Sequence, residues 1–405
     1  MIEPVPLLHH KRLLLGVTGS IAAYKSADLA SKLTQAGAEV DVILTEAAAK
    51  FVTPLTFQSV TGRPVYMDLW GADAHVIHVG LGERADLFVI APATAETIAK
   101  LAHGLADNLL TVTALAARCP LLVAPAMDGG MFAHPATQAN LQTLVERGVT
   151  ILGPAEGRMA SGLVGRGRMV EPEEILGRVR LALGRNGPFK GRKVVVTAGG
   201  TQEPIDPVRF ISNRSSGKQG FALAQAALDR GADVTLIAGP AALATPVGAR
   251  RVDVTTTAEM AEAVLAECDA AHALIMAAAV ADFRPAQVAD QKIKKTAVPQ
   301  VELEKTIDIL STVAERRAVT RKPEVVVGFA AESQDLVENA REKVLRKRLS
   351  LIVANDISAQ DAGFAVDTNR VTLIDAGGGV EQLPLMTKAQ VAETVLERIE
   401  KLLAQ

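Results

Sequence analysis

Short apolar runs alternate with helix-periodic segments along the first half of the chain. An apolar run at 13–17 ends in a small-residue turn at 18–20, and apolar and small residues then recur at helical spacing over 21–33 and 96–117. Further apolar runs lie at 40–44, 87–90 and 121–124. Strands that alternate with helices in this way predict a parallel sheet covered by helices on both faces.

The same pattern starts again in the second half of the chain. An apolar run at 194–196 leads into a glycine turn, a helix over about 218–230 and a further strand. The breaker-rich segment 184–188 separates the two halves. We therefore expect an α/β chain of two Rossmann-like domains, 1–188 and 189–405, each with a mostly parallel sheet covered by helices on both faces.

Ligands of an open parallel sheet bind in the loops that follow the carboxyl ends of its strands. The loops at these positions that carry small or chemically active residues are 18–20, 45, 92–97, 125–131, 197–220 and 277–295. We expect the candidate sites there.

Composition excludes several classes of protein. Of the 405 residues, 49% are apolar and 22% charged, which is typical of a folded chain. Lys+Arg 43 and Asp+Glu 45 leave a net charge of −2, and 3% of residues are aromatic, so we expect no nucleic-acid or membrane partner. The two cysteines, Cys119 and Cys268, are too few for a disulfide framework or a thiolate zinc cluster. We find no targeting segment and no membrane-spanning run, and therefore expect a cytoplasmic protein.

The turn at Gly16–Ile21 lacks the glycine spacing of a dinucleotide fingerprint. It places small residues at the start of a helix, where backbone N–H groups favour a phosphate, and Ser20 is the expected N-cap. Thr94 and Thr97, after another strand, could add hydroxyl donors to the same phosphate. A plain strand-to-helix turn is the alternative interpretation.

Four segments resemble, in order, the flavin-mononucleotide-dependent cysteine decarboxylases: 16–26 (GVTGSIAAYKS), 92–100 (PATAETIAK), 125–131 (PAMDGGM) and 162–169 (GLVGRGRM). The match covers nearly all of residues 12–180. The resemblance implies FMN as cofactor. It would be bound by Gly19, Ser20, Thr45, Ala93, Thr94, Thr97 and Met127.

The resemblance also implies a reaction. A cysteinyl carboxylate has no electron sink at the β position, so the family oxidises the side-chain thiol to a thioaldehyde before carbon dioxide leaves, and the reduced flavin then returns the hydride. His78 matches the position of the family's essential histidine. An imidazole titrates near neutral pH and therefore suits thiol deprotonation. A structural role for a lone histidine before a helix is the alternative.

Two residues depart from the family's common pattern. Asp128 replaces the usual asparagine, which is thought to hold the substrate carboxylate, and Ser161 replaces the usual cysteine. An ionised Asp128 would oppose that carboxylate, whereas a protonated Asp128, its pKa raised by burial and by the like charge, could donate a hydrogen bond. Ser161 is a poorer acid than a thiol, yet it can relay a proton through water. We interpret the pair as a catalytic variant.

Residues 197–220 form the most specific segment of the second half. They combine a glycine turn, Asn and Ser donors and a glycine-rich helix entry, and their apolar residues argue against a plain surface loop. Downstream come 277–283 (AAAVADF), 292–295 (KIKK), 328–332 (GFAAE) and 354–356 (AND). This ordered set resembles phosphopantothenoylcysteine synthetase across residues 189–405.

This second resemblance implies an acid-activating ligase. A carboxylate needs a good leaving group before an amine can displace it, and an acyl-cytidylate made from CTP with Mg²⁺ supplies one. Asn213 would bind the phosphopantothenate or the acyl intermediate, and Lys292 would stabilise charge in the transfer step. The nucleotide would contact Met276, Ala277, Ala278, Asp282, Lys292, Thr306, Ile307, Asp308, Ile309, Phe329, Lys343 and Lys347. The last two lie four residues apart, hence on one helix face, with a solvated basic turn as the alternative. The Mg²⁺ ligands cannot be named from the sequence.

The order of the two resemblances is that of the bifunctional enzymes that make 4′-phosphopantetheine for coenzyme A. The C-terminal half would ligate cysteine to 4′-phosphopantothenate, and the N-terminal half would decarboxylate the product. By resemblance, flavin domains form trimers and synthetase domains form dimers, which together allow a dodecameric homo-oligomer. Two alternatives stay open: a ligase with a catalytically silent flavin domain, and a binding or regulatory protein. Flavin-domain relatives that inhibit protein phosphatases carry long acidic tails, whereas this chain ends in an amphipathic helix.

Overall fold

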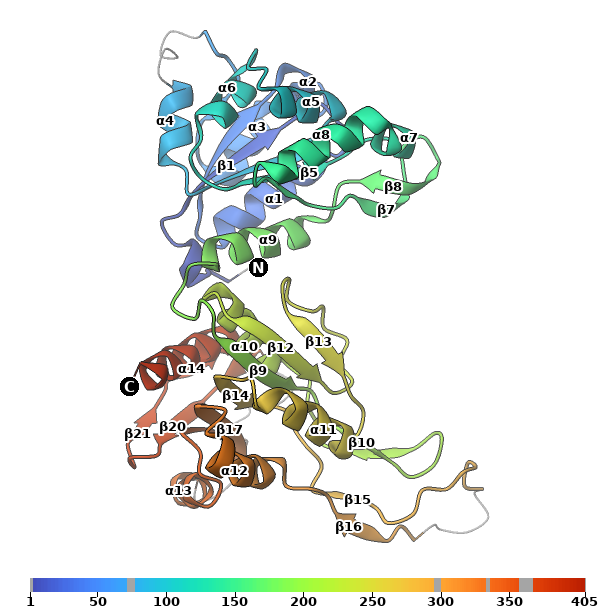
Figure 1. The fold of residues 1–405 in the computed structure, drawn as a ribbon, viewed down its shortest axis with the longest axis vertical. Helices are drawn as coiled ribbons and strands as arrows, with labels where there is room; N and C mark the ends of the chain where they lie inside the picture. Colours follow the sequence, from blue (N-terminus) through green and yellow to red (C-terminus); the bar gives the residue numbers. More distant parts are fainter. Residues whose placement is uncertain (1–2, 71–76, 295–299, 333–335, 357–366, 405) are drawn as a thin grey trace. The chain divides into compact units, whose positions relative to one another are not determined.

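The computed structural model describes residues 3–70, 77–294, 300–332, 336–356 and 367–404, and the chain divides into two compact units, Met1–Leu183 and Gly184–Gln405 (Figure 1). Each unit is built on a sheet that is parallel or mostly parallel and packed between helices, so the predicted fold class is confirmed. Within the described residues, no helix combines the length and apolarity that crossing a membrane would require.

Unit 1 contains a six-stranded parallel sheet with the strand order β3-β2-β1-β4-β5-β6. Its strands are β1 (Arg12–Val17), β2 (Glu39–Leu44), β3 (Val65–Tyr66), β4 (Leu87–Ala93), β5 (Leu121–Pro125) and β6 (Thr150–Ile151). Its helices are η1 (Pro6–Leu8), α1 (Ala23–Gln35), α2 (Glu46–Ala49), α3 (Pro54–Thr61), α4 (Ile77–Arg84), α5 (Ala95–His103), α6 (Leu109–Ala116), α7 (Gly129–Ala133), α8 (Pro135–Glu146) and α9 (Pro172–Gly184). A separate antiparallel hairpin joins β7 (Ala155–Arg158) to β8 (Val164–Arg168).

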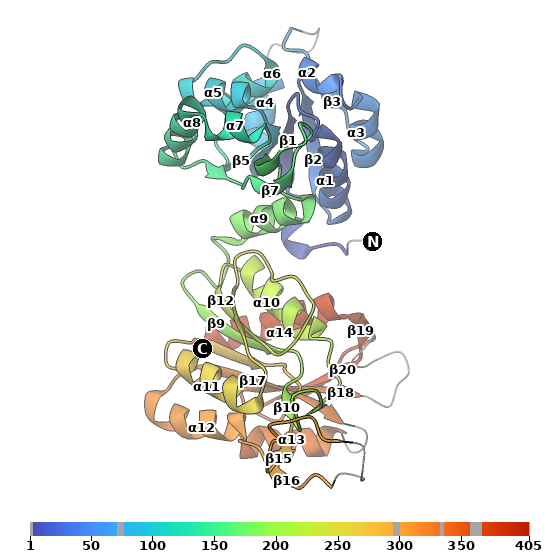
Figure 2. The ribbon, with the colours of Figure 1, turned by 90° about the vertical axis from the view of Figure 1, so that its right-hand side faces the viewer.

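Both faces of this sheet are buried because its strands are almost continuously apolar. On one face, Leu13, Leu15 and Val17 of β1 pack with α1, α3 and α9. On the other face, Leu14 and Phe88 pack with α4, α5, α6 and α8. Figure 2 shows α1 and α3 on one side of the strands and α5 and α8 on the other. The carboxyl ends of β1, β2 and β4 are therefore left as an edge on which a ligand can bind.

Two predicted helix boundaries differ from the structure. The segment 96–117 forms two helices, because Gly104 ends α5 in the left-handed conformation (φ 68°) and Asn108 begins α6 with a capping box. The predicted N-cap is also wrong. Helix α1 begins at Ala23 with Ala22 as its N-cap, and the Ser20 hydroxyl accepts a hydrogen bond from the Ala22 N–H (3.3 Å). Ser20 therefore lies in the turn before the helix.

Unit 2 contains an eight-stranded sheet with the order β13-β12-β9-β14-β17-β18-β20-β21, parallel as far as β18 and antiparallel beyond it. Its strands are β9 (Lys193–Ala198), β12 (Asp233–Ala238), β13 (Arg250–Asp253), β14 (Ala273–Met276), β17 (Val325–Glu332), β18 (Leu351–Asp356), β20 (Val371–Asp375) and β21 (Val380–Gln382). Its helices are α10 (Lys218–Asp229), α11 (Thr257–Cys268), α12 (Ile309–Thr320), α13 (Leu336–Arg346) and α14 (Lys388–Leu403). Three small antiparallel pairs are β10 (Gln202–Pro204) with β11 (Phe210–Ser212), β15 (Phe283–Pro285) with β16 (Leu303–Lys305), and β19 (Thr368–Asn369) with β22 (Met386–Thr387).

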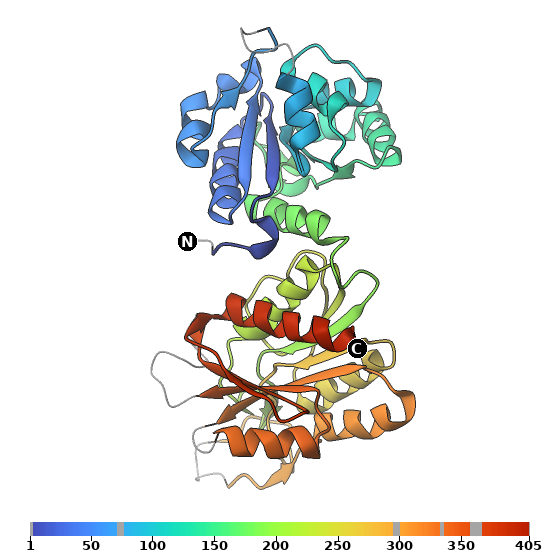
Figure 3. The same cartoon turned by 90° about the vertical axis from the view of Figure 1, so that its left-hand side faces the viewer.

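Helices again cover the central strands of this sheet. Val195, Leu274 and Ile352 pack with α11, α12 and α13 in one core cluster. Helices α10 and α14 pack against each other, and α14 lies across the strands as the red helix in Figure 3. The loops after β9 and β14 meet the carboxyl-terminal half of β17 at this edge of the sheet, where the sequence predicts the ligase site.

Candidate functional site

The predicted phosphate turn of unit 1 is tied to two neighbouring loops. The Thr18 hydroxyl donates to the Pro92 carbonyl (2.8 Å) and accepts from the Thr94 N–H (3.1 Å), so the loops after β1 and β4 are joined. A Cβ added at Gly19 would lie 2.5 Å from the Cβ of Ala47. Only glycine therefore lets this turn approach α2, which follows β2. Three loops that are far apart in the sequence meet at one edge of the sheet.

The hydroxyl groups at this edge are suited to an anion. Ser20 accepts a hydrogen bond from Ala22, and Thr45 caps α2 by accepting from the Ala48 N–H (3.2 Å). Because both oxygens act as acceptors, each hydroxyl proton can be donated to a ligand. Thr94 caps α5, and its hydroxyl lies 3.2 Å from that of Thr97. Hydroxyl donors beside helix N-termini are a donor set that fits the phosphate of a flavin mononucleotide.

A second group of predicted residues meets around α7. The Ala126 N–H donates to the Ala93 carbonyl (3.0 Å), and the Met127 N–H donates to the Gly167 carbonyl (3.0 Å). A Cβ at Gly167 would lie 2.3 Å from the Met127 carbonyl oxygen, so β8 packs directly on this loop. The two motifs that contain Asp128 and Gly167 therefore form one structure.

Asp128 and Ser161, the two departures from the family's common pattern, contact each other. The Ser161 hydroxyl donates to Asp128 Oδ2 (2.7 Å), and the Gly130 N–H donates to Asp128 Oδ1 (3.0 Å) at the start of α7. These two hydrogen bonds hold the pKa of Asp128 below its usual value. The expected rise in this pKa is therefore not found: in the protein without substrate, Asp128 is half-buried and ionised, and Ser161 acts as its donor.

His78 lies in the first turn of α4, which packs against α6 and β1. Its Nδ1 is buried and has no hydrogen-bond partner among the described residues. The two hydrogen bonds recorded at the Asp128 carboxylate come from Gly130 and Ser161, not from His78. Nδ1 of His78 is therefore available to a ligand. Of the three predicted catalytic residues of unit 1, the recorded hydrogen bonds join only Asp128 and Ser161.

The two cysteines do not replace the cysteine for which Ser161 is substituted. Cys119 lies just before β5 and Cys268 ends α11. Burial raises the pKa of each thiol to about 11, so both stay protonated at neutral pH. Neither is placed or ionised to act beside Asp128.

A cavity of about 850 Å³ opens at the carboxyl edge of unit 2. Almost every residue predicted for the ligase lines it: Asn213, Met276, Ala277, Ala278, Asp282, Thr306, Ile307, Asp308, Ile309, Phe329, Lys343 and Lys347. The exception is Lys292, whose side chain is exposed. Segments separated by more than a hundred positions along the chain therefore form one concave site.

The cavity wall is held by hydrogen bonds between these residues. The Asn213 amide donates to the Val280 carbonyl (2.9 Å), and the Lys347 ammonium lies 3.1 Å from Asp308 Oδ1. Burial opposes ionisation of Asp308, but the Ser311 N–H and Lys347 outweigh it and lower its pKa. The Lys347 side chain is only 19% exposed. The solvated basic turn is therefore wrong for Lys347.

Lys292 lies on the chain between β15 and β16, next to a buried carboxylate. Oδ2 of Asp206 accepts from the Ile293 N–H (3.2 Å), and the Arg209 guanidinium donates to the Ile293 carbonyl (3.3 Å). Oδ1 of Asp206 accepts from the N–H groups of Val208 and Arg209 (2.8 Å each). Burial alone would raise the pKa of Asp206, but these hydrogen bonds lower it. The segment that carries Lys292 is thus fixed to the β10–β11 hairpin. Lys295, the last of the predicted lysines, lies outside the described residues.

Family descriptions match both halves of the chain. "Flavoprotein" matches residues 4–183, and "DNA/pantothenate metabolism flavoprotein C-terminal domain" matches residues 189–403. The Coenzyme A biosynthesis bifunctional protein CoaBC of Bacillus subtilis is 46% identical over 405 residues, covering 98% of this chain and 99% of the relative. The chain belongs to the CoaBC family. The family prediction is therefore confirmed, and the chain is a flavoprotein and a bifunctional enzyme of coenzyme A biosynthesis.

Other CoaBC proteins match to a similar extent. That of Vibrio cholerae is 46% identical over 396 residues (96% of this chain, 98% of the relative), and that of Mycobacterium tuberculosis H37Rv is 46% identical over 415 residues (98% and 99%). Among solved structures, the C-terminal domain of a CoaBC covers 54% of this chain and 98% of its own, with 38% identity and a TM-score of 0.47. A PPC decarboxylase mutant complexed with pantothenoylaminoethenethiol covers 43% and 98%, with 37% identity and a TM-score of 0.39.

Sequence reasoning missed two side chains of the ligase cavity. Gln219 Oε1 and Asn355 Oδ1 are buried, line the cavity and have no hydrogen-bond partner among the described residues. Such atoms are costly unless a ligand or water satisfies them. Both residues lie within segments that carry the resemblance, 197–220 and 354–356, but the sequence alone did not single them out as cavity residues.

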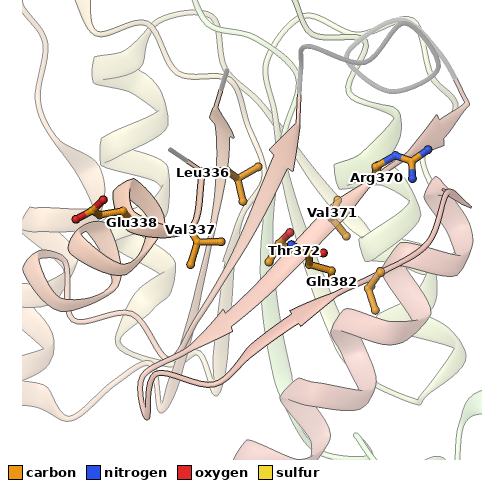
Figure 4. Close-up of a pocket in the computed structure, with 8 residues that line it drawn as sticks. Leu336, Val337, Glu338, Arg370, Val371, Thr372 and Gln382 are labelled. Atoms are coloured by element: carbon orange, nitrogen blue, oxygen red, sulfur yellow. The ribbon is translucent and has the colours of Figure 1, made fainter. Parts of the chain in front are cut away.

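A smaller cavity, of about 560 Å³, lies between α13 and the antiparallel strands β20 and β21. Figure 4 shows its apolar residues Leu336 and Val337 on α13 facing Val371 and Thr372 on β20. None of the predicted site residues lines this cavity. Over the described part of the chain, no group of three or more His, Cys, Asp or Glu side chains is arranged to bind a metal ion.

Proposed function

We propose that unit 2 joins cysteine to 4′-phosphopantothenate with CTP and Mg²⁺, and that unit 1 decarboxylates the product to 4′-phosphopantetheine with FMN. The observation that carries the ligase assignment is the single cavity into which the separate predicted segments converge. The family's role in coenzyme A biosynthesis supports the same pair of reactions.

The ligase cavity suits acid activation followed by amine transfer. The carboxylate of 4′-phosphopantothenate attacks the α-phosphorus of CTP, so an acyl–phosphate bond forms and pyrophosphate leaves. The cysteine amine then displaces CMP from the acyl carbon and loses a proton. Asn213 at the cavity wall can orient the acid, and Lys292 can stabilise the negative charge that develops during transfer. Mg²⁺ would arrive with the nucleotide phosphates.

The edge of unit 1 suits a flavin and a carboxylated substrate. Gly19, Ser20, Thr45 and Thr94 would hold the FMN phosphate, and Ala93, Thr97 and Met127 would complete the pocket. When bound, FMN supplies reversible oxidation of the substrate's side-chain thiol. We assign thiol deprotonation to His78, whose Nδ1 has no partner among the described residues. Ser161, whose hydroxyl donates to Asp128, is assigned to proton transfer to the decarboxylated product.

One incubation tests both halves. The full chain reconstituted with FMN is mixed with 4′-phosphopantothenate, cysteine, CTP and Mg²⁺. The masses of the products are then measured by mass spectrometry. A product lighter than the adduct by one carbon dioxide supports both reactions. The adduct alone would indicate a ligase with a silent flavin domain, and no product would indicate a binding or regulatory protein.

The ionised Asp128 gives a prediction about pH. Because its pKa is lowered, Asp128 stays charged as pH rises and loses its charge only in acid. Asp128→Asn should therefore leave the shape of the decarboxylation profile unchanged between about pH 6 and pH 9. It should also lower the KM for the cysteinyl substrate by up to about fivefold, because one like charge at a partly solvated position is removed. Steady-state carbon dioxide release measures both quantities. A wild-type rate that falls above neutral pH while the variant's does not would show that Asp128 works protonated.

The Asp206 contacts give a prediction about the transfer step. Asp206→Asn keeps an acceptor for Val208 and Arg209 but places an amide NH₂ against the Ile293 N–H. The segment of Lys292 should then lose its fixed position, and transfer to cysteine should slow by roughly tenfold with little change in CTP affinity. Single-turnover CMP release measures the step. Because Asp206 acts through Lys292, adding Asp206→Asn to Lys292→Gln should cost nothing further, and a multiplicative loss would contradict this role.

We also infer that the chain assembles as a homo-oligomer in the cytoplasm, with trimeric flavin units and dimeric ligase units. Exposed apolar side chains support assembly through both units: Tyr24 and Trp70 in unit 1, and Phe210, Phe283 and Leu303 in unit 2. Two free cysteines fit a reducing compartment.

A further inference from the structure

A buried carboxylate is linked to the wall of the ligase cavity. Glu203, in β10, is only 2% exposed and is not one of the residues that line the cavity. Its Oε1 accepts two hydrogen bonds from Thr257, the first residue of α11: one from the N–H (2.8 Å) and one from the hydroxyl (2.7 Å). Both donors are uncharged, and the positive end of the α11 dipole offsets the charge only in part. Burying a carboxylate on uncharged donors opposes folding, so stability alone does not explain Glu203.

Glu203 ends a chain of hydrogen bonds between buried side chains. The hydroxyl oxygens of Thr257 and Thr201 lie 3.1 Å apart, and the Ala281 N–H donates to the Thr201 hydroxyl (2.9 Å). Because an ionised carboxylate can only accept, the Thr257 proton is directed to Glu203 and the Thr201 proton to Thr257. The lone pairs of Thr201 then remain to accept from Ala281. Glu203 therefore sets the direction of the whole chain, and such ordering strengthens each of its hydrogen bonds.

The other end of the chain lies on the loop after β14, which forms part of the cavity wall. Ala281 and Asp282 both line the cavity, and Asp282 is exposed. The Ala281 carbonyl accepts from the Thr306 hydroxyl (2.6 Å), and the Thr306 N–H donates to the Asp282 carbonyl (3.0 Å). The main chain from Ala281 to Asp282 is thus held from two directions, by Thr201 and by Thr306. Asp282 and Thr306 are two of the residues predicted to contact the nucleotide.

We propose that Glu203 is a positioning residue of the ligase, which fixes Asp282 for the nucleotide through the two threonines. This inference rests on the proposed ligase function, because that function places CTP against Asp282. Glu203 itself touches no substrate. It orders the threonine protons, the ordered Thr201 holds the main chain before Asp282, and the exposed Asp282 side chain then extends from a fixed position. A group that is already ordered binds its ligand more tightly, because less conformational freedom is lost on binding.

Steady-state kinetics of the full chain test this role, with pyrophosphate release measured as CTP and 4′-phosphopantothenate are varied in turn. Glu203→Ala leaves both Thr257 donors without their acceptor. It should raise the KM for CTP by about tenfold or more and leave the KM for 4′-phosphopantothenate within about twofold. Glu203→Gln keeps an acceptor oxygen for Thr257, so its KM for CTP should rise by no more than about threefold. Glu262→Ala, at an exposed position on α11, is the control and should match the wild type.

A second variant keeps the test decisive if Glu203→Ala folds poorly. Thr201→Val leaves the contact between Glu203 and Thr257 in place but removes the acceptor of the Ala281 N–H, and it should raise the KM for CTP to a similar extent. Loss of folded protein alone would lower kcat and the unfolding temperature without changing this KM. A KM for CTP within about twofold of the wild type in both variants would overturn the proposal, as would equal increases for CTP and 4′-phosphopantothenate. A wild type that releases no pyrophosphate would instead overturn the ligase function on which the proposal rests.

Discussion

His78→Asn should stop the reaction sequence at the ligated adduct, with the rate of carbon dioxide release lowered by roughly a hundredfold to ten-thousandfold. Asparagine is smaller than histidine but keeps a polar side chain, and it cannot take up a proton near neutral pH. Deprotonation of the substrate thiol should therefore fail, while ligation continues, because His78 lies in unit 1 and the ligase cavity is lined by residues of unit 2. Mass spectrometry of the products should show the adduct accumulating at the wild-type rate of CTP consumption.

The structure also predicts that this variant stays folded. Since Nδ1 of His78 has no hydrogen-bond partner among the described residues, replacing the imidazole removes no hydrogen bond at that atom. The unfolding temperature and the visible spectrum of bound flavin should stay close to those of the wild type. His103→Asn, at an exposed position in the last turn of α5, is the matched control and should decarboxylate normally. Loss of flavin from His78→Asn would instead assign His78 to the pocket wall.

Sequence patterns predicted the features of this chain that depend on neighbouring residues along the chain. The alternation of strands and helices gave both sheets, and the rule that ligands bind at the carboxyl ends of parallel strands located the Thr18 and Asn213 loops correctly at sheet edges. Local patterns were less reliable at helix ends. Gly104 and Asn108 divide a stretch whose periodicity continues through both of them.

Contacts between distant residues were not predictable in the same way. Ser161 and Asp128 are 33 positions apart, and their hydrogen bond depends on how the β7–β8 hairpin packs on α7. Of the two forms of Asp128 that the sequence left open, that contact favours the ionised one, because the Ser161 hydroxyl donates to the carboxylate at 2.7 Å. Lys388 is similar. In the sequence it is one lysine at the start of an amphipathic helix, and it becomes a cavity residue only when α14 packs against α10.

The segment that carries Lys292 shows what the structure adds to a sequence motif. The lysine-rich run predicted a cation beside the nucleotide, yet the Lys292 side chain is exposed and does not line the cavity. The hairpin on which it lies does reach the cavity, through Phe283 and Lys305 at its base. Asp206 holds the next residue, Ile293, by its main chain. This arrangement favours a role in the transfer step over a role in holding the ground-state nucleotide.

Lys292→Gln should therefore separate the two half-reactions of the ligase. Pyrophosphate release, which reports acyl-cytidylate formation, should proceed for about one turnover, whereas CMP release should slow by roughly a hundredfold to a thousandfold because a positioned charge is lost from the transition state. Rapid-quench measurement of pyrophosphate and CMP in the same reaction distinguishes the steps. The acyl-cytidylate should accumulate and be detectable by mass.

Lys294→Gln is the matched comparison, since it removes the same charge two residues away on the same exposed segment. If Lys292 acts as a positioned group, the neighbouring variant should lose much less activity, and the loss should be in CTP affinity rather than in CMP release. Equal losses in both variants would mean that the segment contributes only general positive charge. If pyrophosphate release is slower in Lys292→Gln, Lys292 acts in carboxylate activation and not in amine transfer. The bond between the carboxylate and the α-phosphorus would then depend on Lys292.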